Sequence, residues 1–354
     1  MPTNNPNDLK IHVLNVGFGD NILIEFPKDN NGKRSYGLVD CYNSKKTIDY
    51  IKKLNPNSLE KILFKFVCAT HPHYDHIKGI KKILETKDYE IIEFWDCGFR
   101  HYSKTYRDIL LTLQNANIKM VRVSSGMEFY HNKVRITVLS PSVALRNRYA
   151  TYGVDMNNAS IVLRIEHHKE DVLYLRSKEY EGFESKEDIR NAGKSVVILA
   201  GDSEFDSWSH ISQEYPKLEK TKEHKPLIKE MLNHLSCSLI KVSHHGSMHS
   251  APLDIYEKMS PKTAIISTEQ KTSSKTIGGK TLTRDLFPHD LTIIALEECG
   301  VKILTTDGSY ESQLDNSGNI KDSLNVHEGS IILKVPAGGS IQWNKYSDDT
   351  KNLP

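Results

Sequence analysis

Residues 70–79 read Thr70-His71-Pro72-His73-Tyr74-Asp75-His76-Ile77-Lys78-Gly79 and place four possible metal ligands within six positions. The segment follows an apolar, β-rich run over 62–70 and precedes a predicted helix over 77–84, so the four side chains share one tight loop. His71 and His73 alternate and can bind one ion, whereas Asp75 and His76 are adjacent and point to a second ion nearby. The spacing therefore predicts a two-metal site at the end of a strand.

Polar residues also follow other apolar runs of the chain. The strands expected over 36–40, 196–200 and 239–242 end at Asp40, at Gly201-Asp202 and at Ser243-His244-His245. Strands predicted over 10–16 and 21–26 flank the turn Gly17-Phe18-Gly19-Asp20, and strands over 331–335 and 341–343 are expected to close a sheet near the C-terminus. This pattern is typical of an enzyme whose site is assembled from loops along one edge of a rigid sheet.

The composition sets limits on partners and location. The 354 residues carry 47 Lys+Arg and 45 Asp+Glu, a net charge of +2, so any surface that binds a polyanion must be local. Five widely spaced cysteines without a C-x-x-C pair indicate neither a zinc finger nor a disulfide framework. The sequence has no leader-like start and no apolar run long enough to span a bilayer, so we expect a cytoplasmic protein without membrane contact.

The chain shows no internal repeat or low-complexity linker, and we expect one domain over 1–354. Two segments rich in Lys and Glu, at about 169–194 and 205–236, are predicted to be insertions that cover or flank the active edge.

The motifs together resemble those of the metallo-β-lactamase fold superfamily, in order along most of the chain. The resemblance implies an αββα four-layer sandwich of the α/β class. It also implies that Asp40 supports the metal loop and that Asp202 bridges two metals. Either His244 or His245 would supply the last histidine to the second metal, and the sequence leaves that choice open. The full set of expected metal ligands is His71, His73, Asp75, His76, Asp202, His244 and His245.

The third motif departs from the common superfamily pattern. Many members supply a histidine there, but this chain has Asp155-Met156-Asn157-Asn158-Ala159-Ser160. This sequence, together with Gly17-Phe18-Gly19-Asp20 and Ser243-His244-His245-Gly246-Ser247, resembles the subgroup that contains the hydrolase domain of ComEC-type DNA-uptake proteins. The resemblance further implies supporting roles for Asp20 and Asn158 and substrate contacts for Asn157 and Ser247.

Two divalent ions, zinc or alternatively manganese, would share a hydroxide that attacks the substrate, with Asp75 and Asp202 as catalytic carboxylates. The missing third-motif histidine leaves room for a phosphate oxygen. The segment 271–284 carries four basic residues and no acidic ones, and its Lys275 and Lys280 are candidates for phosphate contacts. His289 follows this segment and is a candidate proton donor to the leaving oxygen.

The sequence thus predicts a dinuclear-metal hydrolase that cleaves phosphodiester bonds in DNA, RNA or nucleotides. Two alternatives stay open. One is a small-molecule phosphoesterase or ester hydrolase similar to phosphorylcholine esterases, and the other is a regulatory protein that binds metal without turnover. Substrate size, the metal, protein partners and oligomeric state are not determined by the sequence.

Overall fold

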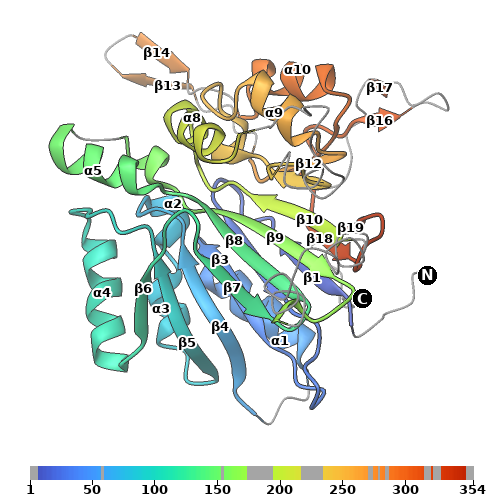
Figure 1. Cartoon of the computed structure of the whole chain (residues 1–354). Coiled ribbons are helices and arrows are strands. Elements are labelled where there is room, and N and C mark those ends of the chain that lie inside the picture. The colour runs from blue at the N-terminus through green and yellow to red at the C-terminus, as the bar shows by residue number, and fades with distance from the viewer. Residues whose placement is uncertain are drawn as a thin grey trace, which may run out of the picture.

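Two β-sheets face each other, and helices cover the outer side of each (Figure 1). The computed structural model describes residues 7–56, 60–152, 155–173, 194–216, 234–269, 274–277, 280–283, 287–314, 320–321 and 328–347. Within these ranges no helix has both the length and the apolar character that a membrane crossing requires.

The first sheet has eight strands in the order β19-β18-β1-β2-β3-β4-β5-β6. The strands are β1 (Leu9–Val13), β2 (Asn21–Glu25), β3 (Tyr36–Cys41), β4 (Ile62–Ala69), β5 (Tyr89–Asp96), β6 (Lys119–Arg122), β18 (Ser330–Val335) and β19 (Gln342–Tyr346). β1 and β2 pair antiparallel around the predicted turn, and β18 and β19 close the sheet as expected from the C-terminal sequence. Strands β3 to β6 run parallel, so their carboxyl ends meet at one edge.

The second sheet has seven strands in the order β15-β12-β11-β10-β9-β8-β7. The strands are β7 (Glu128–His131), β8 (Val134–Ser140), β9 (Val162–His168), β10 (Lys194–Leu199), β11 (Leu239–Lys241), β12 (Thr263–Ile266) and β15 (Lys302–Thr305). Strands β10, β11, β12 and β15 are parallel, whereas β9 runs antiparallel to β10. The start of β9 therefore lies beside the carboxyl ends of the parallel strands.

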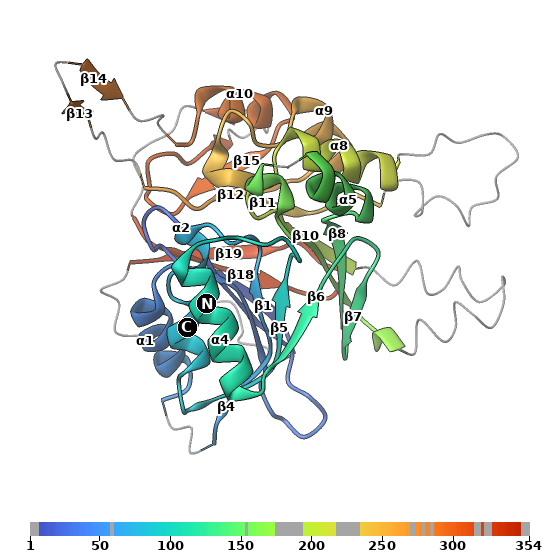
Figure 2. The ribbon, with the colours of Figure 1, turned by 90° about the vertical axis from the view of Figure 1, so that its left-hand side faces the viewer.

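The helices fall into two outer layers (Figures 1 and 2). On the first sheet they are α1 (Ser44–Leu54), α2 (Tyr74–Ile77), α3 (Ile80–Leu84) and α4 (Lys104–Ala116), and on the second they are α8 (Phe205–Glu214), α9 (Leu253–Met259) and α10 (Asp290–Glu298). Helix α5 (Val143–Tyr152) follows β8, and short 3-10 helices form at η1 (Met156–Ala159) and η4 (Ser243–Gly246).

Three apolar cores separate the layers. Ile11, Phe66 and Trp95 of the first sheet meet Ile136, Ile165 and Val197 of the second in the central core. The alternate strand residues point outward, where Leu38 and Val67 pack on α1, α3 and α4, while Ile198 and Ile240 pack on α8, α9 and α10. Three cores between four layers confirm the predicted αββα sandwich.

The remaining elements are two small hairpins, β13 (Ser274–Ile277) with β14 (Lys280–Thr283), and β16 (Gln313–Leu314) with β17 (Ile320–Lys321). The first predicted insertion lies largely outside the described residues, at 174–193, as does the 217–233 part of the second. The part of the second that is described begins with α8, whose Trp208 is fully buried in the outer core of the second sheet.

Candidate metal centre

The polar residues singled out in the sequence converge where the two sheets present their loops. His71, Asp75 and His76 lie directly after β4, Asp202 follows β10, and His245 follows β11 in η4. Because β4 belongs to the first sheet and β10 and β11 to the second, the cluster joins the loop-bearing edges of both sheets. Such an edge is the common location of sites in α/β proteins.

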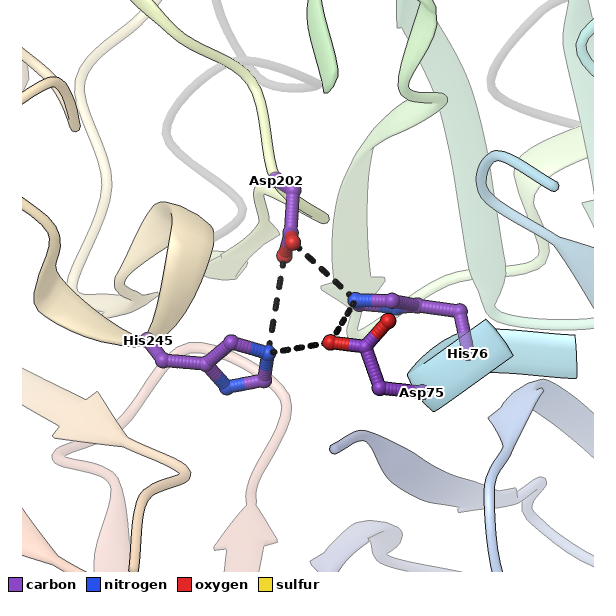
Figure 3. A group of neighbouring side chains, drawn as sticks. All are labelled: Asp75, His76, Asp202 and His245. Carbon is purple, nitrogen blue, oxygen red and sulfur yellow. Dashed lines mark ion pairs between the residues drawn. The ribbon is translucent and has the colours of Figure 1, made fainter. Parts of the chain in front are cut away.

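Asp75, His76, Asp202 and His245 each offer a ligand atom, and these atoms lie within 4.8 Å of one another (Figure 3). Asp202 Oδ2 is 3.1 Å from His76 Nε2 and 3.9 Å from His71 Nε2, and Asp202 Oδ1 is 3.9 Å from His245 Nε2. Asp75 Oδ2 is 3.7 Å from His245 Nε2 and 3.9 Å from His76 Nε2. Asp202 therefore lies within 3.9 Å of three histidine nitrogens, those of His71, His76 and His245.

The histidine rings of this group are fixed through their Nδ1 atoms. His76 Nδ1 is 2.7 Å from Asp40 Oδ2, His245 Nδ1 is 2.7 Å from the Ser267 carbonyl, and His71 Nδ1 is 3.2 Å from Thr70 Oγ1. A carboxylate and a carbonyl can only accept, so in His76 and His245 Nδ1 carries the proton. When these rings are neutral, Nε2 keeps its lone pair, and it faces the centre as in metal-binding histidines.

Buried lone pairs without partners show that the residues fit a metal. His71 Nε2, His245 Nε2 and Asp202 Oδ1 have no hydrogen-bond partner among the described residues, although His71 and His245 are fully buried. Leaving such atoms unpaired is costly, and cations in contact with them remove the cost. Imidazole nitrogens mixed with carboxylate oxygens suit zinc, manganese and related divalent ions.

The same contacts shift the ionisation of the site. Burial opposes charge on His76, but the Asp202 and Asp40 carboxylates hold its pKa well above the usual value. Burial likewise opposes charge on Asp202, yet His76 and His245 hold its pKa well below the usual value. Burial and the neighbouring His76 lower the pKa of His71. In the metal-free protein at neutral pH, His76 therefore carries a proton that an ion must displace.

Asp40 connects the metal loop to the first sheet. Its Oδ1 accepts from the Thr70 N–H at 2.8 Å, and its Oδ2 accepts from the Thr70 hydroxyl at 2.7 Å and from His76. Asp40 has a φ of 57°, which side-chain-bearing residues rarely adopt. These contacts match the supporting role that the resemblance implies for this residue.

Asp20 lies behind the loop, in an ion pair with the fully buried Lys241 of β11. Its backbone N–H donates to the Asp75 carbonyl at 3.3 Å. Gly19 makes this approach possible, because a Cβ at that position would lie 2.7 Å from the Asp75 oxygen and φ there is +145°. Asp20 thereby links the predicted turn after β1 to the metal loop.

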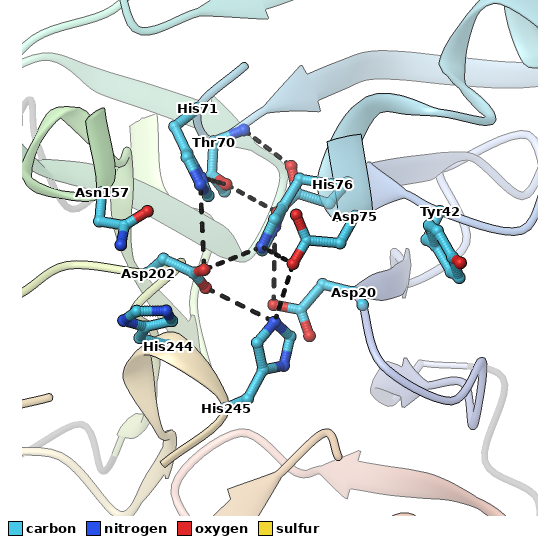
Figure 4. A network of polar contacts seen from close by, with 12 residues as sticks. Asp20, Tyr42, Thr70, His71, Asp75, His76, Asn157, Asp202, His244 and His245 are labelled. Atoms are coloured by element: carbon cyan, nitrogen blue, oxygen red, sulfur yellow. Dashed lines mark hydrogen bonds and ion pairs between the residues drawn. The ribbon is translucent and has the colours of Figure 1, made fainter. Parts of the chain in front are cut away.

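The structure separates the two consecutive histidines that the sequence could not distinguish. His244 and His245 have φ values of 46° and 52°, a left-handed pair that turns their rings to different surroundings. His245 enters the group of four, and Figure 4 shows the His244 ring turned away from it. His244 Nδ1 is instead 2.8 Å from Glu204 Oε1. His245 is thus the residue that the structure brings to the centre.

Other predicted residues lie around this centre or apart from it. The His73 ring is 4.6 Å from that of His71, and His73 lies outside the group of four. Asn158 Oδ1 accepts from the Ser207 N–H of α8 at 2.9 Å, and Ser247 Oγ accepts from the His249 N–H at 3.2 Å. Asn157 donates to Glu204 at 3.0 Å.

His289 lies outside the group of four. His289 caps α10, with its Nδ1 accepting from the Leu291 N–H at 3.2 Å, and its own N–H donates to the Gly246 carbonyl. The side chains of Lys275 and Lys280 lie outside the described part of the structure. The roles of these three residues stay predictions.

Two residues of the site were missed by sequence reasoning. Glu204 holds both Asn157 and His244, and it follows the Gly-Asp motif by only two positions. Lys241 is a lysine within the apolar run Leu239-Ile240-Lys241-Val242, which itself indicates an unusual buried charge. That pattern could have pointed to a buried acidic partner, although not to Asp20 in particular.

The chain matches no protein-family model. It is 22% identical over 315 residues to ComE operon protein 3 of Bacillus subtilis (strain 168), which covers 84% of this chain and 32% of the relative. The chain therefore spans about a third of the length of the curated relative it matches. The match confirms the resemblance to ComEC-type proteins that the motifs indicate.

Solved structures with some likeness include the metallo-β-lactamase fold protein YhfI of Bacillus subtilis, at 11% identity and a TM-score of 0.44, over 84% of this chain and 96% of that one. A long form RNase Z from yeast has 13% identity and a TM-score of 0.35, over 76% and 39% of the two chains. A diphosphatase from the PhnP family has 10% identity and a TM-score of 0.33, over 71% and 72%.

Proposed function

We propose that this protein is a hydrolase that uses two divalent metal ions to cleave phosphodiester bonds in a nucleic acid or a nucleotide. The observation that carries the proposal is that His71 Nε2 and His245 Nε2, both buried and unpaired, each lie 3.9 Å from a different oxygen of Asp202 between the two sheets. A purely structural cluster would leave few such atoms without partners.

Each residue of the chain has a definite part in this proposal. His71 and His73 would hold one ion, Asp75, His76 and His245 would hold the other, and Asp202 would contact both. Ions bound there would supply Lewis-acid chemistry, lowering the pKa of water and stabilising the charge that develops on phosphoryl oxygens. Asp40 keeps the His76 lone pair directed at the centre through its contact with Nδ1. The Asp75 side chain is 25% exposed, so substrate and solvent can enter on its side.

Two features beside the centre favour a phosphodiester. Glu204 Oε1 lies 2.8 Å from His244 Nδ1, an ion-pair contact that holds this side of the ring and leaves Nε2 to contact a substrate oxygen. Aromatic rings flank the centre: Phe18 lies 4.8 Å from the His245 ring, and Phe287 lies 5.8 Å from the His244 ring. Tyr74, next to Asp75, is 59% exposed. Exposed or half-buried rings beside a metal centre suit the bases of a nucleotide or a single strand.

The test uses the purified full chain with its bound metals determined. We expect it to cleave a chromogenic phosphodiester and at least one of linear single-stranded DNA, duplex DNA or RNA in the presence of zinc or manganese. Asp202→Ala and Asp75→Ala should each lower kcat/KM by about 1,000-fold or more, because metal stabilisation amounts to several kcal/mol of barrier. Asp254→Ala, at an exposed carboxylate in the first turn of α9, is the matched control and should behave as wild type.

The outcomes separate the rival functions. Cleavage of the chromogenic diester without any polymer supports a small-molecule phosphoesterase, and cleavage of acyl esters alone contradicts phosphodiester chemistry. Hydrolysis that is equal in wild type and both aspartate variants would overturn the proposal. Tight metal binding without turnover of any substrate would instead support the regulatory protein.

A further inference from the structure

Asn157 occupies the part of the chain where the resemblance would place a histidine. It lies in η1, just before β9, and is 8% exposed. Figure 4 shows its side chain beside His71 and Asp202, on the side of the centre away from His245. It is thus close to the ion that His71 and His73 would bind in the proposed function.

The orientation of the Asn157 amide is set by Glu204. Asn157 Nδ2 donates to Glu204 Oε1 at 3.0 Å, and a carboxylate can only accept, so the nitrogen must face Glu204. The carbonyl oxygen is therefore directed the other way. Glu204 is held in turn by His244, at 2.8 Å, so the orienting carboxylate is itself fixed.

Asn157 Oδ1 is buried and has no hydrogen-bond partner within the described residues. Asp202 lies beside it and offers only carboxylate oxygens, which accept hydrogen bonds and donate none. An amide oxygen among such acceptors gains nothing from them, and leaving it unpaired is costly. A cation satisfies it, and amide oxygens are ordinary ligands of hard divalent ions.

We propose that Asn157 completes the ligand set of the first metal through Oδ1, with Glu204 as the residue that positions it. The assignment rests on the metal centre of the proposed function, and it gives Asn157 a different role from the substrate contact expected from the sequence. The first metal then has nitrogen from His71 and His73 and oxygen from Asp202 and Asn157. This donor set is harder than one with three histidines, so it favours manganese relative to zinc.

Metal binding to the metal-free protein tests the assignment without any substrate. Wild type should bind two ions in calorimetric titrations with zinc and with manganese. Asn157→Leu, which keeps the size but removes the oxygen, should retain one site and weaken the other by about 10-fold or more. Asn157→His should restore the second site and raise its preference for zinc over manganese.

Glu204→Gln gives an independent check, because it changes no ligand but removes the acceptor that orients the amide. We expect it to weaken the same site, by less than Asn157→Leu does. Thermal unfolding of each metal-free variant shows whether it folds, and if Asn157→Leu does not, the Glu204→Gln and Asn157→His titrations decide.

Two ions bound by Asn157→Leu with wild-type affinity would overturn the assignment and leave the proposed hydrolase intact. Fewer than two ions bound by wild type would overturn both. Loss of one site in Asn157→Leu in a protein without hydrolytic activity would support the assignment and contradict the proposed function.

Discussion

Two buried charged clusters lie near opposite ends of β9. Before its first residue is the metal centre, where several lone pairs have no partner. Near its last residue is Glu166, fully buried, with three cationic side chains and one histidine around its carboxylate: Arg135, Arg164, Lys194 at 3.2 Å and the His168 ring at 3.1 Å. In the metal centre several carboxylates share the charge of His76, whereas in the other cluster several cations surround a single carboxylate.

The difference separates a binding site from a structural cluster. Glu166 alternates with the core residues Leu163 and Ile165, so it lies on the outer face of the sheet, and its neighbours satisfy it. Its pKa is held well below the usual value, since burial is outweighed by Arg164 and the other cations. In the metal centre His76 pairs with Asp202, but Nε2 of His71, Nε2 of His245 and Oδ1 of Asp202 have no hydrogen-bond partner among the described residues. Arg164 Nε in the paired cluster is unpaired as well, so what distinguishes the metal centre is that several of its unpaired atoms can be ligands of a cation.

Removing the carboxylate of the paired cluster should give the largest change in stability. Glu166→Ala leaves Arg164 and its neighbours buried without a counterion, and we expect the free energy of unfolding to fall by about 3–5 kcal/mol. Urea denaturation measures this loss. Metal stoichiometry should stay at the wild-type value, and a variant that folds normally but loses a metal would contradict the separation of the two clusters.

Beside the metal centre, Lys241 forms a buried ion pair of the kind found in the Glu166 cluster, because its ammonium group pairs with buried Asp20. Lys241→Met should lower the free energy of unfolding by about 3 kcal/mol, since it leaves a buried charge uncompensated. Adding Asp20→Asn should recover much of that loss in the same denaturation experiment. No recovery in the double variant would show that the lysine acts through packing rather than charge.

Asp202 should affect the stability of the metal-free protein less than Glu166 does. In metal-free protein, Asp202→Asn removes one of the two carboxylates beside the protonated His76 and leaves the other, Asp40, in place, so we expect the free energy of unfolding to fall by about 1–2 kcal/mol. Wild type should gain about 2.7 kcal/mol for each ion that is present at 100 times its Kd, and the variant should lose most of this gain. The measurement is thermal unfolding with and without metal, and an equal gain in both proteins would refute the bridging position.

The smallest expected effect is the acid dependence of the paired cluster. The folded-state pKa of Glu166 is below the unfolded value, so its stabilisation is complete above the unfolded pKa of about 4.3 and is lost as pH falls toward the folded one. Wild type should therefore lose more stability than Glu166→Ala between pH 5 and 3. Parallel stability curves for the two proteins would show that Glu166 binds its proton alike in both states.

The sequence predicted which residues come together where a polar residue follows an apolar strand. Asp40, His76 and Asp202 follow apolar runs, and the parallel strands β3, β4 and β10 bring their loops together as predicted. The four-layer sandwich and the C-terminal hairpin β18–β19 were predicted as well. Alternation of apolar residues and the motif order carry this information.

What the sequence left open depends on backbone geometry and on distant partners. The φ values of His244 and His245 direct their rings apart. Two consecutive histidines in a sequence do not show which of the two rings faces the centre. The Lys241–Asp20 pair joins residues more than two hundred positions apart, and Glu204 is significant only because Asn157 and His244 meet it. Contacts of this kind follow from the folded arrangement rather than from any local pattern.

The ligands come from both sheets, His76 from the loop after β4 and His245 from the segment after β11, and this has a mechanical consequence. An ion held by both would link the two sheets at the edge that carries their loops. Because it binds the folded arrangement, it would oppose separation of the sheets at this edge. Removal of the ion by a chelator would then destabilise this loop-bearing edge first, while the opposite ends of the sheets stay packed on the central core.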